Sequence, residues 1–193
     1  MVFDLLYFFE MRRVTLNTVC ILFILFFCGA SRADTNSIEK TANSLISGFD
    51  VISGQPYRWS LLEKGTRVYI NRKRQTYTEV PTPLAGQLTL RTSNNDKFFE
   101  AVESPFISFK VKKKVKVYVL YSNFYTQLEE VWLNDRNGWR KEDFVVKTNT
   151  SQNKATRLVR SKIFPAGSEV KLDGNGCVIK NCSMYTVVIV PIK

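Results

Sequence analysis

One short stretch of this sequence gathers residue types that act on carbohydrates. It holds five acids and two tryptophans: Glu129, Glu130, Trp132, Asp135, Trp139, Glu142 and Asp143. Two carboxylates at a suitable separation hydrolyse a glycosidic bond, but adjacency in sequence does not set that separation, and charged loop residues are usually solvated. The chain contains no histidine, which removes Ser-His, Cys-His and His-metal catalysis. The sequence therefore predicts no catalytic residue and a protein that is not an enzyme.

Two other segments carry oxygen atoms of the kind that bind metal ions. The segments "SNNDK" (93–97) and "DGNG" (173–176) contain Asp and Asn. Their composition is equally typical of turns, in which Gly174 and Gly176 supply a positive φ angle. The cysteines lack the further thiols or histidines that a zinc site needs. We therefore expect no metal and no cofactor.

Positive charge is the most distinctive chemistry of the chain. Lys and Arg number 28 against 17 Asp and Glu, which gives a formal net charge of +11. This balance favours acidic polysaccharide, anionic membrane or nucleic acid as a partner, although it also serves solubility. Three basic segments are candidate binding patches, and an exposed tryptophan in the first would stack on a sugar, although a buried tryptophan that covers one end of the sandwich is the alternative. They are Trp139 with Arg136, Arg140 and Lys141; Arg72, Lys73 and Arg74; and Lys112, Lys113, Lys114 and Lys116.

The N-terminal segment has the pattern of a secretory signal peptide. In "MRRVTLNTVCILFILFFCGASRA" (11–33), two arginines precede an apolar run, and Ser31 and Ala33 suit a cleavage site. An uncleaved membrane anchor is the alternative, but the apolar run is short for a complete span. Removal of residues 1–33 takes away three arginines and two acids and leaves a charge of +10. We therefore expect a secreted, extracellular protein without a stable membrane span, and secretion argues against nucleic acid as a partner.

The cysteines and two sequons agree with secretion. Cys177 and Cys182 remain after cleavage, and in an oxidising compartment their simplest state is one disulfide bond. Asn149 and Asn181 begin the glycosylation patterns "NTS" and "NCS". Asn149 lies in a polar segment typical of an exposed loop, whereas disulfide formation at Cys182 competes with glycan transfer at Asn181.

Alternation of apolar and polar residues dominates the chain after Tyr57. Segments of this kind are "TRVYINR" (66–72), "GQLTLRT" (86–92), "PFISFKV" (105–111), "VKVYVLY" (115–121), "TRLVRS" (156–161), "SEVKLDG" (168–174) and "MYTVVIVP" (184–191). Turn sequences separate them, so the pattern predicts an all-β domain, an antiparallel β-sandwich of jelly-roll type, over residues 55–193. The preceding residues 34–54 have the apolar spacing of a short amphipathic helix, or they form an arm.

The stretch "SFKVKKKVKVYVLY" (108–121) combines two such strands with five lysines. Ile107, Phe109 and Val111 share one strand face, and Val115 begins a second alternating set. The lysines between the two sets indicate a turn, so the stretch reads as a hairpin-like element with its valines inward. Most of the lysine cluster is thus explained without a ligand, and anion binding is its second role.

Several segments resemble a known family of modules. They are "GTRVYINR" (65–72), "VPTPLAGQLTLRTSNNDK" (80–97), "ISFKVKKKVKVYVLY" (107–121), "WL" (132–133), "FPAGSEVKLDGNG" (164–176) and "MYTVVIVP" (184–191). In this order they resemble the β-sandwich accessory modules of secreted bacterial polysaccharide lyases and other glycan-acting proteins. That resemblance implies an extracellular, carbohydrate-binding-like domain. Asn71, Asn95, Ser122 and Phe124 depart from the family's pattern, so a site built on its acids is not carried over.

Two hypotheses about function follow. The first is a secreted, non-catalytic binding module for anionic carbohydrate. The second is a structural or protein-interaction domain of the extracellular matrix or cell surface, with an extracellular protein as its partner. Basic segments grouped on one face would favour the first, and basic segments scattered around the domain would favour the second.

Overall fold

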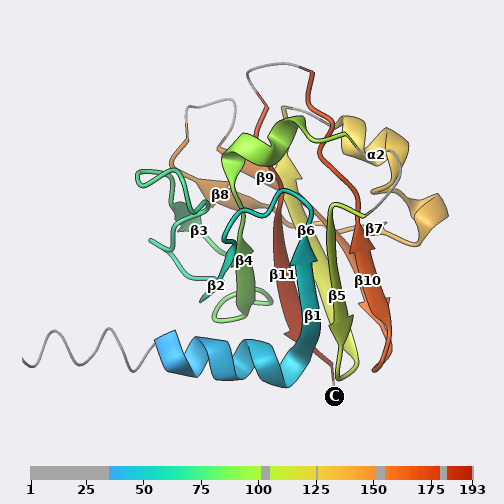
Figure 1. The fold of residues 1–193 in the computed structure, drawn as a ribbon. Helices are drawn as coiled ribbons and strands as arrows, with labels where there is room; N and C mark the ends of the chain where they lie inside the picture. Colours follow the sequence, from blue (N-terminus) through green and yellow to red (C-terminus); the bar gives the residue numbers. More distant parts are fainter. Residues whose placement is uncertain (1–34, 101–104, 125, 151–154, 179–181, 193) are drawn as a thin grey trace, which may run out of the picture. The chain divides into compact units, whose positions relative to one another are not determined.

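The computed structural model describes residues 35–100, 105–124, 126–150, 155–178 and 182–192. The predicted signal peptide and Asn181 lie outside the described residues. Residues 35–45 are helical, and the chain divides after Glu39 into two units (Figure 1). The second unit, Lys40–Lys193, contains every strand that is described. No helix in the described part of the chain is long and apolar enough to cross a membrane.

A small antiparallel sheet forms one layer of this unit. Its strands, in spatial order, are β1 (Ile46–Val51), β5 (Ile107–Val111) and β10 (Glu169–Leu172). Ile107, Phe109 and Val111 are buried, whereas Lys110 between the last two is exposed. The alternation predicted for this segment is therefore confirmed, and it arises because one face of the sheet meets water.

A larger antiparallel sheet forms the second layer. Its strands, in spatial order, are β2 (Arg58–Leu61), β4 (Leu88–Arg91), β11 (Thr186–Pro191), β6 (Val115–Ser122), β9 (Thr156–Phe164), β8 (Val146–Thr148) and β3 (Tyr77–Glu79), and β7 (Arg140–Lys141) pairs with β9 beside β8. Two isolated bridges, Arg67 with Thr76 and Tyr69 with Thr92, link the region of β3 to the end of β4. The sheet is thus strongly curled.

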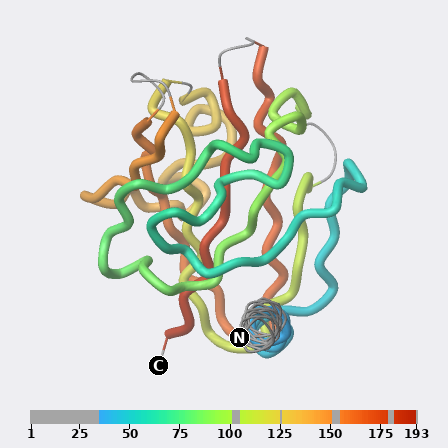
Figure 2. Tube along the Cα trace, turned by 90° about the vertical axis from the view of Figure 1, so that its left-hand side faces the viewer, coloured from blue at the N-terminus to red at the C-terminus, as the bar shows by residue number. Residues whose placement is uncertain are grey.

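Both faces of the larger sheet are largely buried at its central strands β4, β6 and β11. One face packs on the small sheet, where the Trp59 ring lies 5.5 Å from Phe49 and 6.4 Å from Phe109. The segment between β2 and β4 covers the other face (Figure 2). In that segment Tyr69 Oη donates to the Met184 carbonyl oxygen at 2.7 Å, and Tyr77 Oη lies 2.9 Å from the Thr186 hydroxyl. The predicted all-β, antiparallel sandwich is confirmed.

The domain begins earlier than the sequence indicated. Residues 46–51 form β1, which pairs with β5, so the expected start at residue 55 is too late. The alternation is broken in this strand because its register shifts between Ser47 and Asp50, and Gly48 has φ of 60°. A bulge of this kind removes the period of two on which strand prediction depends.

The lysine-rich turn also differs from the expectation. Lys112, Lys113 and Lys114 are exposed and do connect two strands, as predicted. However, β5 and β6 belong to different sheets, so the segment crosses between the two layers and is not a hairpin. The backbone still reverses direction, and Lys112 Nζ donates to the Asn43 carbonyl oxygen at 2.7 Å.

Candidate functional site

A basic groove lies beside β9, where this strand meets β6 and the short strand β7. Its volume is about 540 Å³, and it is lined by Lys116, Gly138, Arg140, Lys141, Glu142, Ser161, Lys162 and Ile163. Four of these residues are cations and one is an acid. The lining therefore favours a negatively charged ligand.

Strand register assembles this groove from three separate parts of the sequence. Lys116 on β6 lies opposite Ile163 on β9, and Arg140 on β7 lies opposite Ser161. The sequence placed Lys116 in one candidate patch and Arg140 with Lys141 in another. The structure joins these members and adds Lys162 and Ile163, whose side chains differ in chemistry: Ile163 is an exposed aliphatic residue.

One carboxylate in the groove is neutralised by its neighbours. Glu142 pairs with Lys116 at 2.7 Å and accepts a hydrogen bond from the Ser161 hydroxyl at 2.5 Å. Burial alone would raise the pKa of Glu142, but the hydrogen bonds from Lys116 and Ser161 outweigh it and lower the pKa. Burial likewise opposes the charge of Lys116, yet the bond to Glu142 raises its pKa. Both groups are therefore charged at neutral pH.

The other three cations of the groove have no carboxylate partner in the described part of the chain. Arg140 and Lys141 are exposed, and Lys162 Nζ donates to the Asn137 carbonyl oxygen at 2.8 Å. Gly138 allows this turn because its φ is 78°, a left-handed conformation that favours glycine. Arg140, Lys141 and Lys162 are thus the groove's cations that a ligand would meet first.

Trp139 does not form an exposed aromatic platform, and that prediction is wrong. The side chain is only 3% exposed. Its ring packs edge-on against Trp132 at 5.9 Å and Phe164 at 6.1 Å. Because a buried aromatic ring contributes a large apolar area to the core, Trp139 fixes the start of β7 to the body of the domain.

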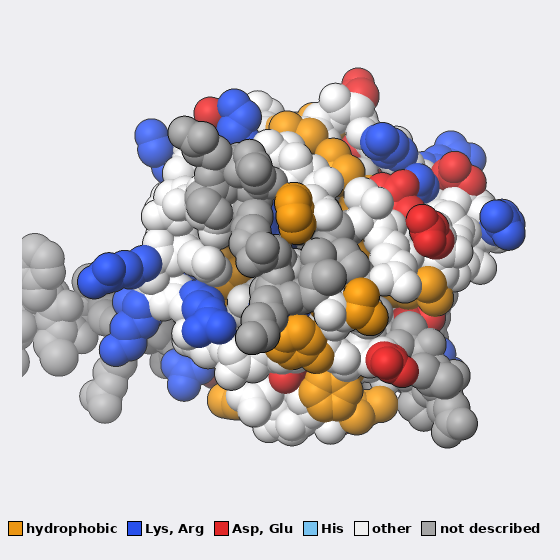
Figure 3. Space-filling model, turned by 90° about the horizontal axis from the view of Figure 1, so that it is seen from above, with side chains coloured by type: hydrophobic (Ala, Val, Ile, Leu, Met, Phe, Trp, Pro, Cys, Tyr) orange, Lys and Arg blue, Asp and Glu red, His pale blue; other side chains and the backbone are white. Residues whose placement is uncertain are grey.

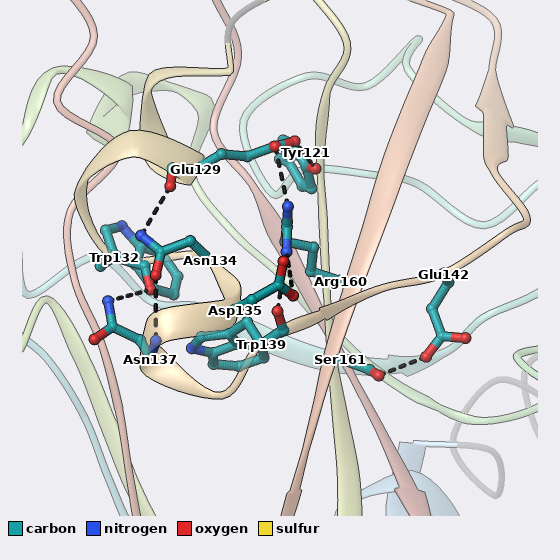
Figure 4. A network of polar contacts seen from close by, with 10 residues as sticks. All are labelled: Tyr121, Glu129, Trp132, Asn134, Asp135, Asn137, Trp139, Glu142, Arg160 and Ser161. Atoms are coloured by element: carbon teal, nitrogen blue, oxygen red, sulfur yellow. Dashed lines mark hydrogen bonds and ion pairs between the residues drawn. The ribbon is translucent and has the colours of Figure 1, made fainter.

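A buried arginine anchors the segment that carries β7 (Figure 4). Arg160 Nη1 donates to the Trp139 carbonyl oxygen at 2.9 Å and pairs with Asp135 at 3.2 Å, and Nη2 pairs with Glu129 at 3.2 Å. Burial alone would lower the pKa of Arg160, but Glu129 raises it. The Tyr121 hydroxyl also donates to Glu129. One guanidinium thereby ties α2 (Gln127–Val131) and η2 (Asp135–Asn137) to β9.

Three of the five acids in the stretch from Glu129 to Asp143 are engaged with cations. Glu129 and Asp135 bind Arg160, and Glu142 binds Lys116. Asn134 supports the same segment, since its Nδ2 donates to the Glu129 carbonyl oxygen and its Oδ1 caps Asn137. These contacts hold the segment that carries α2 and η2 against β9.

The remaining basic candidates lie outside the groove lining. Lys112, Lys113 and Lys114 occupy the turn between β5 and β6, and Arg136 is exposed on η2. Arg72, Lys73 and Arg74 occupy an exposed turn that precedes β3, where Arg72 Nη2 donates to Asn95 Oδ1 at 3.3 Å. The basic segments thus do not all share one surface, a distribution that by itself favours a structural or protein-interaction domain, so the binding hypothesis depends on the groove alone.

The predicted disulfide is present, and one sequon can be placed. Cys177 and Cys182 are bonded. Asn149 is exposed, as predicted, but its side chain is structural: Oδ1 accepts from the Thr76 amide at 2.9 Å, and Nδ2 donates to the Arg74 carbonyl oxygen at 2.8 Å. Its glycosylation stays a prediction.

Lys162 is the groove residue that the sequence concealed. It stands alone in "RSKIF" (160–164), without a basic neighbour except Arg160, which is buried. In the register of β9 on β6, Lys162 lies opposite Val117 and Ile163 lies opposite Lys116, and the lining of the groove includes both Lys162 and Ile163. A single sequence does not contain that register.

Known proteins share this fold without a detectable sequence family. A segment of a β-glucuronidase from glycoside hydrolase family 2 matches with a TM-score of 0.65 and 21% identity, over 78% of this chain and 15% of that protein. A GH138 enzyme targeting pectin rhamnogalacturonan II matches with a TM-score of 0.48 and 13% identity, over 76% of this chain and 17% of that enzyme. No family model and no curated protein sequence matches the chain. The first likeness establishes the fold as a β-sandwich that also occurs within a much longer enzyme.

Proposed function

We propose that this protein is a secreted, non-catalytic module that binds anionic carbohydrate in the groove beside β9. The observation that carries the proposal is the lining of that groove, which combines Arg140, Lys141 and Lys162 with the exposed side chain of Ile163. Cations provide charge-assisted hydrogen bonds to carboxylate or sulfate groups. An aliphatic side chain among them contacts the apolar face of a sugar ring.

Two further observations support this role. Glu129, Asp135 and Glu142 hold the groove in place through Arg160 and Lys116, so their carboxylates serve structure. The β-glucuronidase that shares the fold acts on a glycan, and the chain corresponds to a small part of it. The sequence adds the signal-peptide pattern of residues 1–33, which supports a partner outside the cell.

The test compares two triple variants that lose the same charge. Arg140→Gln/Lys141→Gln/Lys162→Gln alters the groove, and Lys112→Gln/Lys113→Gln/Lys114→Gln alters the exposed turn. Binding of the purified chain to heparin, polygalacturonate and neutral dextran is measured by calorimetry at 0.15 M salt. We expect the groove variant to lose tenfold or more in affinity for one polyanion, about what the loss of charge-assisted bonds predicts. The turn variant should lose much less.

Equal losses in the two variants would show that binding follows net charge alone, and the groove would have no special role. Absence of binding to every polyanion would instead favour a protein-interaction domain. Added salt should weaken binding in the wild type, since exposed charges are screened over about 8 Å at physiological ionic strength.

A further inference from the structure

Three arginines converge on the other side of the domain, around the end of β4. Arg58 on the edge strand β2 lies directly opposite Arg91 on β4 in the antiparallel register. Side chains at such positions point to the same face of the sheet and lie close together. Arg67 precedes by two residues Tyr69, whose carbonyl oxygen accepts a hydrogen bond from Arg91 Nη2 at 3.4 Å. Three segments thus bring guanidinium groups to one place.

The arrangement lacks the acids that normally compensate such a cluster. No ion pair joins Arg58, Arg67 or Arg91 to an acid in the part of the chain that the structure describes. Burial, and then the positive charges of Arg67 and Arg58, lower the pKa of Arg91. Like charges directly opposite on a sheet destabilise it. The groove differs in this respect, because Glu142 and Ser161 support its Lys116.

Arg91 also carries a polar atom that the protein leaves unused. It is half-buried, and its Nε is buried without a hydrogen-bond partner among the described residues. Arg58 and Arg67 are exposed, so their guanidinium groups reach solvent. Figure 3 shows Lys and Arg side chains gathered on its left, the side on which β2 and β3 lie in Figure 1. An anion that approaches these residues therefore meets the half-buried Arg91 and the exposed Arg58 and Arg67.

We propose that Arg58, Arg67 and Arg91 form a second oxyanion site, which takes a single carboxylate or sulfate group. Guanidinium groups suit these ligands because their planar donors form paired hydrogen bonds with two oxygen atoms. A bound oxyanion would neutralise the repulsion between Arg58 and Arg91. The site lies on β2, β4 and the segment between them and shares no residue with the groove lining, so it does not depend on the function proposed above.

Thermal unfolding of the full chain tests this site with small anions. The probes are sodium sulfate, glucose 6-sulfate and glucuronic acid, each at millimolar concentration, with glucose and sodium chloride as controls. The variants are Arg58→Gln and Arg67→Gln, and Arg136→Gln is the matched control because it removes one exposed arginine elsewhere. Sulfate stabilises most proteins at high concentration by exclusion, so the informative quantity is the difference between variants at low concentration.

We expect saturable stabilisation of the wild type and of Arg136→Gln, and about tenfold weaker binding in Arg58→Gln and Arg67→Gln. Without added anion, both site variants should unfold at a temperature equal to or above that of the wild type, since repulsion is removed. The same anion response in all four proteins would overturn the proposal. A response to glucose 6-sulfate or to glucuronic acid assigns the site to sulfated or carboxylated sugars. A response to inorganic sulfate alone assigns it to the free ion.

The groove and this site can fail separately. Groove variants that bind polyanions normally would overturn the proposed function and leave the arginine site intact. Loss of anion stabilisation in the groove variant, with an unchanged anion response in Arg58→Gln, would overturn the arginine site and leave the proposed function of the groove intact.

Discussion

Two arginines on β9 show two ways of burying a positive charge. Arg157 and Arg160 are three residues apart on one strand, so they point to opposite faces of the large sheet, and both are almost fully buried. Arg160 has Glu129 and Asp135 as ion-pair partners. Arg157 has none in the described part of the chain: Nη2 donates to Tyr69 Oη at 2.5 Å, and Nη1 donates to the Met184 carbonyl oxygen at 3.4 Å. The Arg157 guanidinium also lies 5.7 Å from the centre of the Tyr69 ring.

Arg160 is therefore a structural clamp, that is, a residue that holds other elements in place, whereas Arg157 only fills space in the core. The partners of Arg160 come from α2 and η2, which are short helices, so the ion pairs hold these two helices against β9. The partners of Arg157 belong to segments that the two sheets already fix. A buried ion pair is costly to break from one side, whereas an apolar residue of similar volume often replaces a buried charge without loss.

Arg160→Met should be the most damaging change. It removes the cation that compensates Glu129 and leaves the Trp139 carbonyl oxygen without its donor, so we expect a loss of about 2–3 kcal/mol in the free energy of unfolding. Urea denaturation measures this loss. Arg160→Lys keeps the charge but not the forked geometry, so its free energy of unfolding should lie between those of the wild type and Arg160→Met. A loss below that of Arg157→Met would contradict the assignment of Arg160 as the clamp.

Alkaline pH sharpens the comparison on the Arg157 side. Burial raises the pKa of Tyr77 to about 12, although Thr186 and the charge of Arg157 lower it. The folded-state pKa lies above the unfolded value, so the stabilising contribution is complete below pH 10 and is lost as pH rises through 12. For Tyr77 the loss amounts to about 2–3 kcal/mol.

Urea midpoints measured between pH 9 and 12 test this expectation. Tyr77→Phe should reduce the slope of stability against pH, and Arg157→Met should keep Tyr77 protonated to higher pH. Arg160→Met should leave the titration of Tyr77 unchanged. An identical slope in wild type and Tyr77→Phe would show that other tyrosines govern the alkaline transition.

Arg157→Met should change stability little. The methionine fills a similar volume, and Tyr69 Oη still donates to the Met184 carbonyl oxygen, so we expect the free energy of unfolding to stay within about 1 kcal/mol of the wild type. The same urea series provides the measurement. A loss as large as that of Arg160→Met would mean that the ring and hydroxyl of Tyr69 stabilise Arg157 as well as carboxylates do.

Glu142→Gln removes the carboxylate partner of Lys116. Lys116 is a partly exposed cation and thus a third case beside the buried Arg157 and Arg160. The lowered pKa of Glu142 means that its contribution is present above about pH 4.5 and is lost as pH falls further. The Lys116–Glu142 pair is partly solvated, so its loss should cost less than about 1 kcal/mol. The same change removes the negative charge of the groove, and polyanion affinity should rise about two- to threefold. Weaker binding would show that Glu142 positions Lys116 for the ligand.

The sequence by itself determined the fold class and the positions of most strands. Period-two segments such as Ile107–Val111 and Thr186–Pro191 became strands because alternation is a local property that follows from the geometry of an extended chain. The disulfide between Cys177 and Cys182 was predicted from the signal-peptide pattern and from the two cysteines that remain after its removal. The strand at Ile46–Val51 escaped because its bulge and Gly48 disrupt that local pattern.

Only the tertiary structure decided which strand faces are exposed to solvent and which basic side chains lie close together. Both faces of β6 are buried because a second layer, the segment between β2 and β4, covers the side that a two-layer sandwich would expose. Trp139 entered the core because Phe164 and Trp132 lie beside it. The groove exists because the register of β6, β7 and β9 brings Lys116, Arg140 and Ile163 together. Pairing between distant strands and the layer above a sheet depend on the whole chain, so a local pattern carries no record of them.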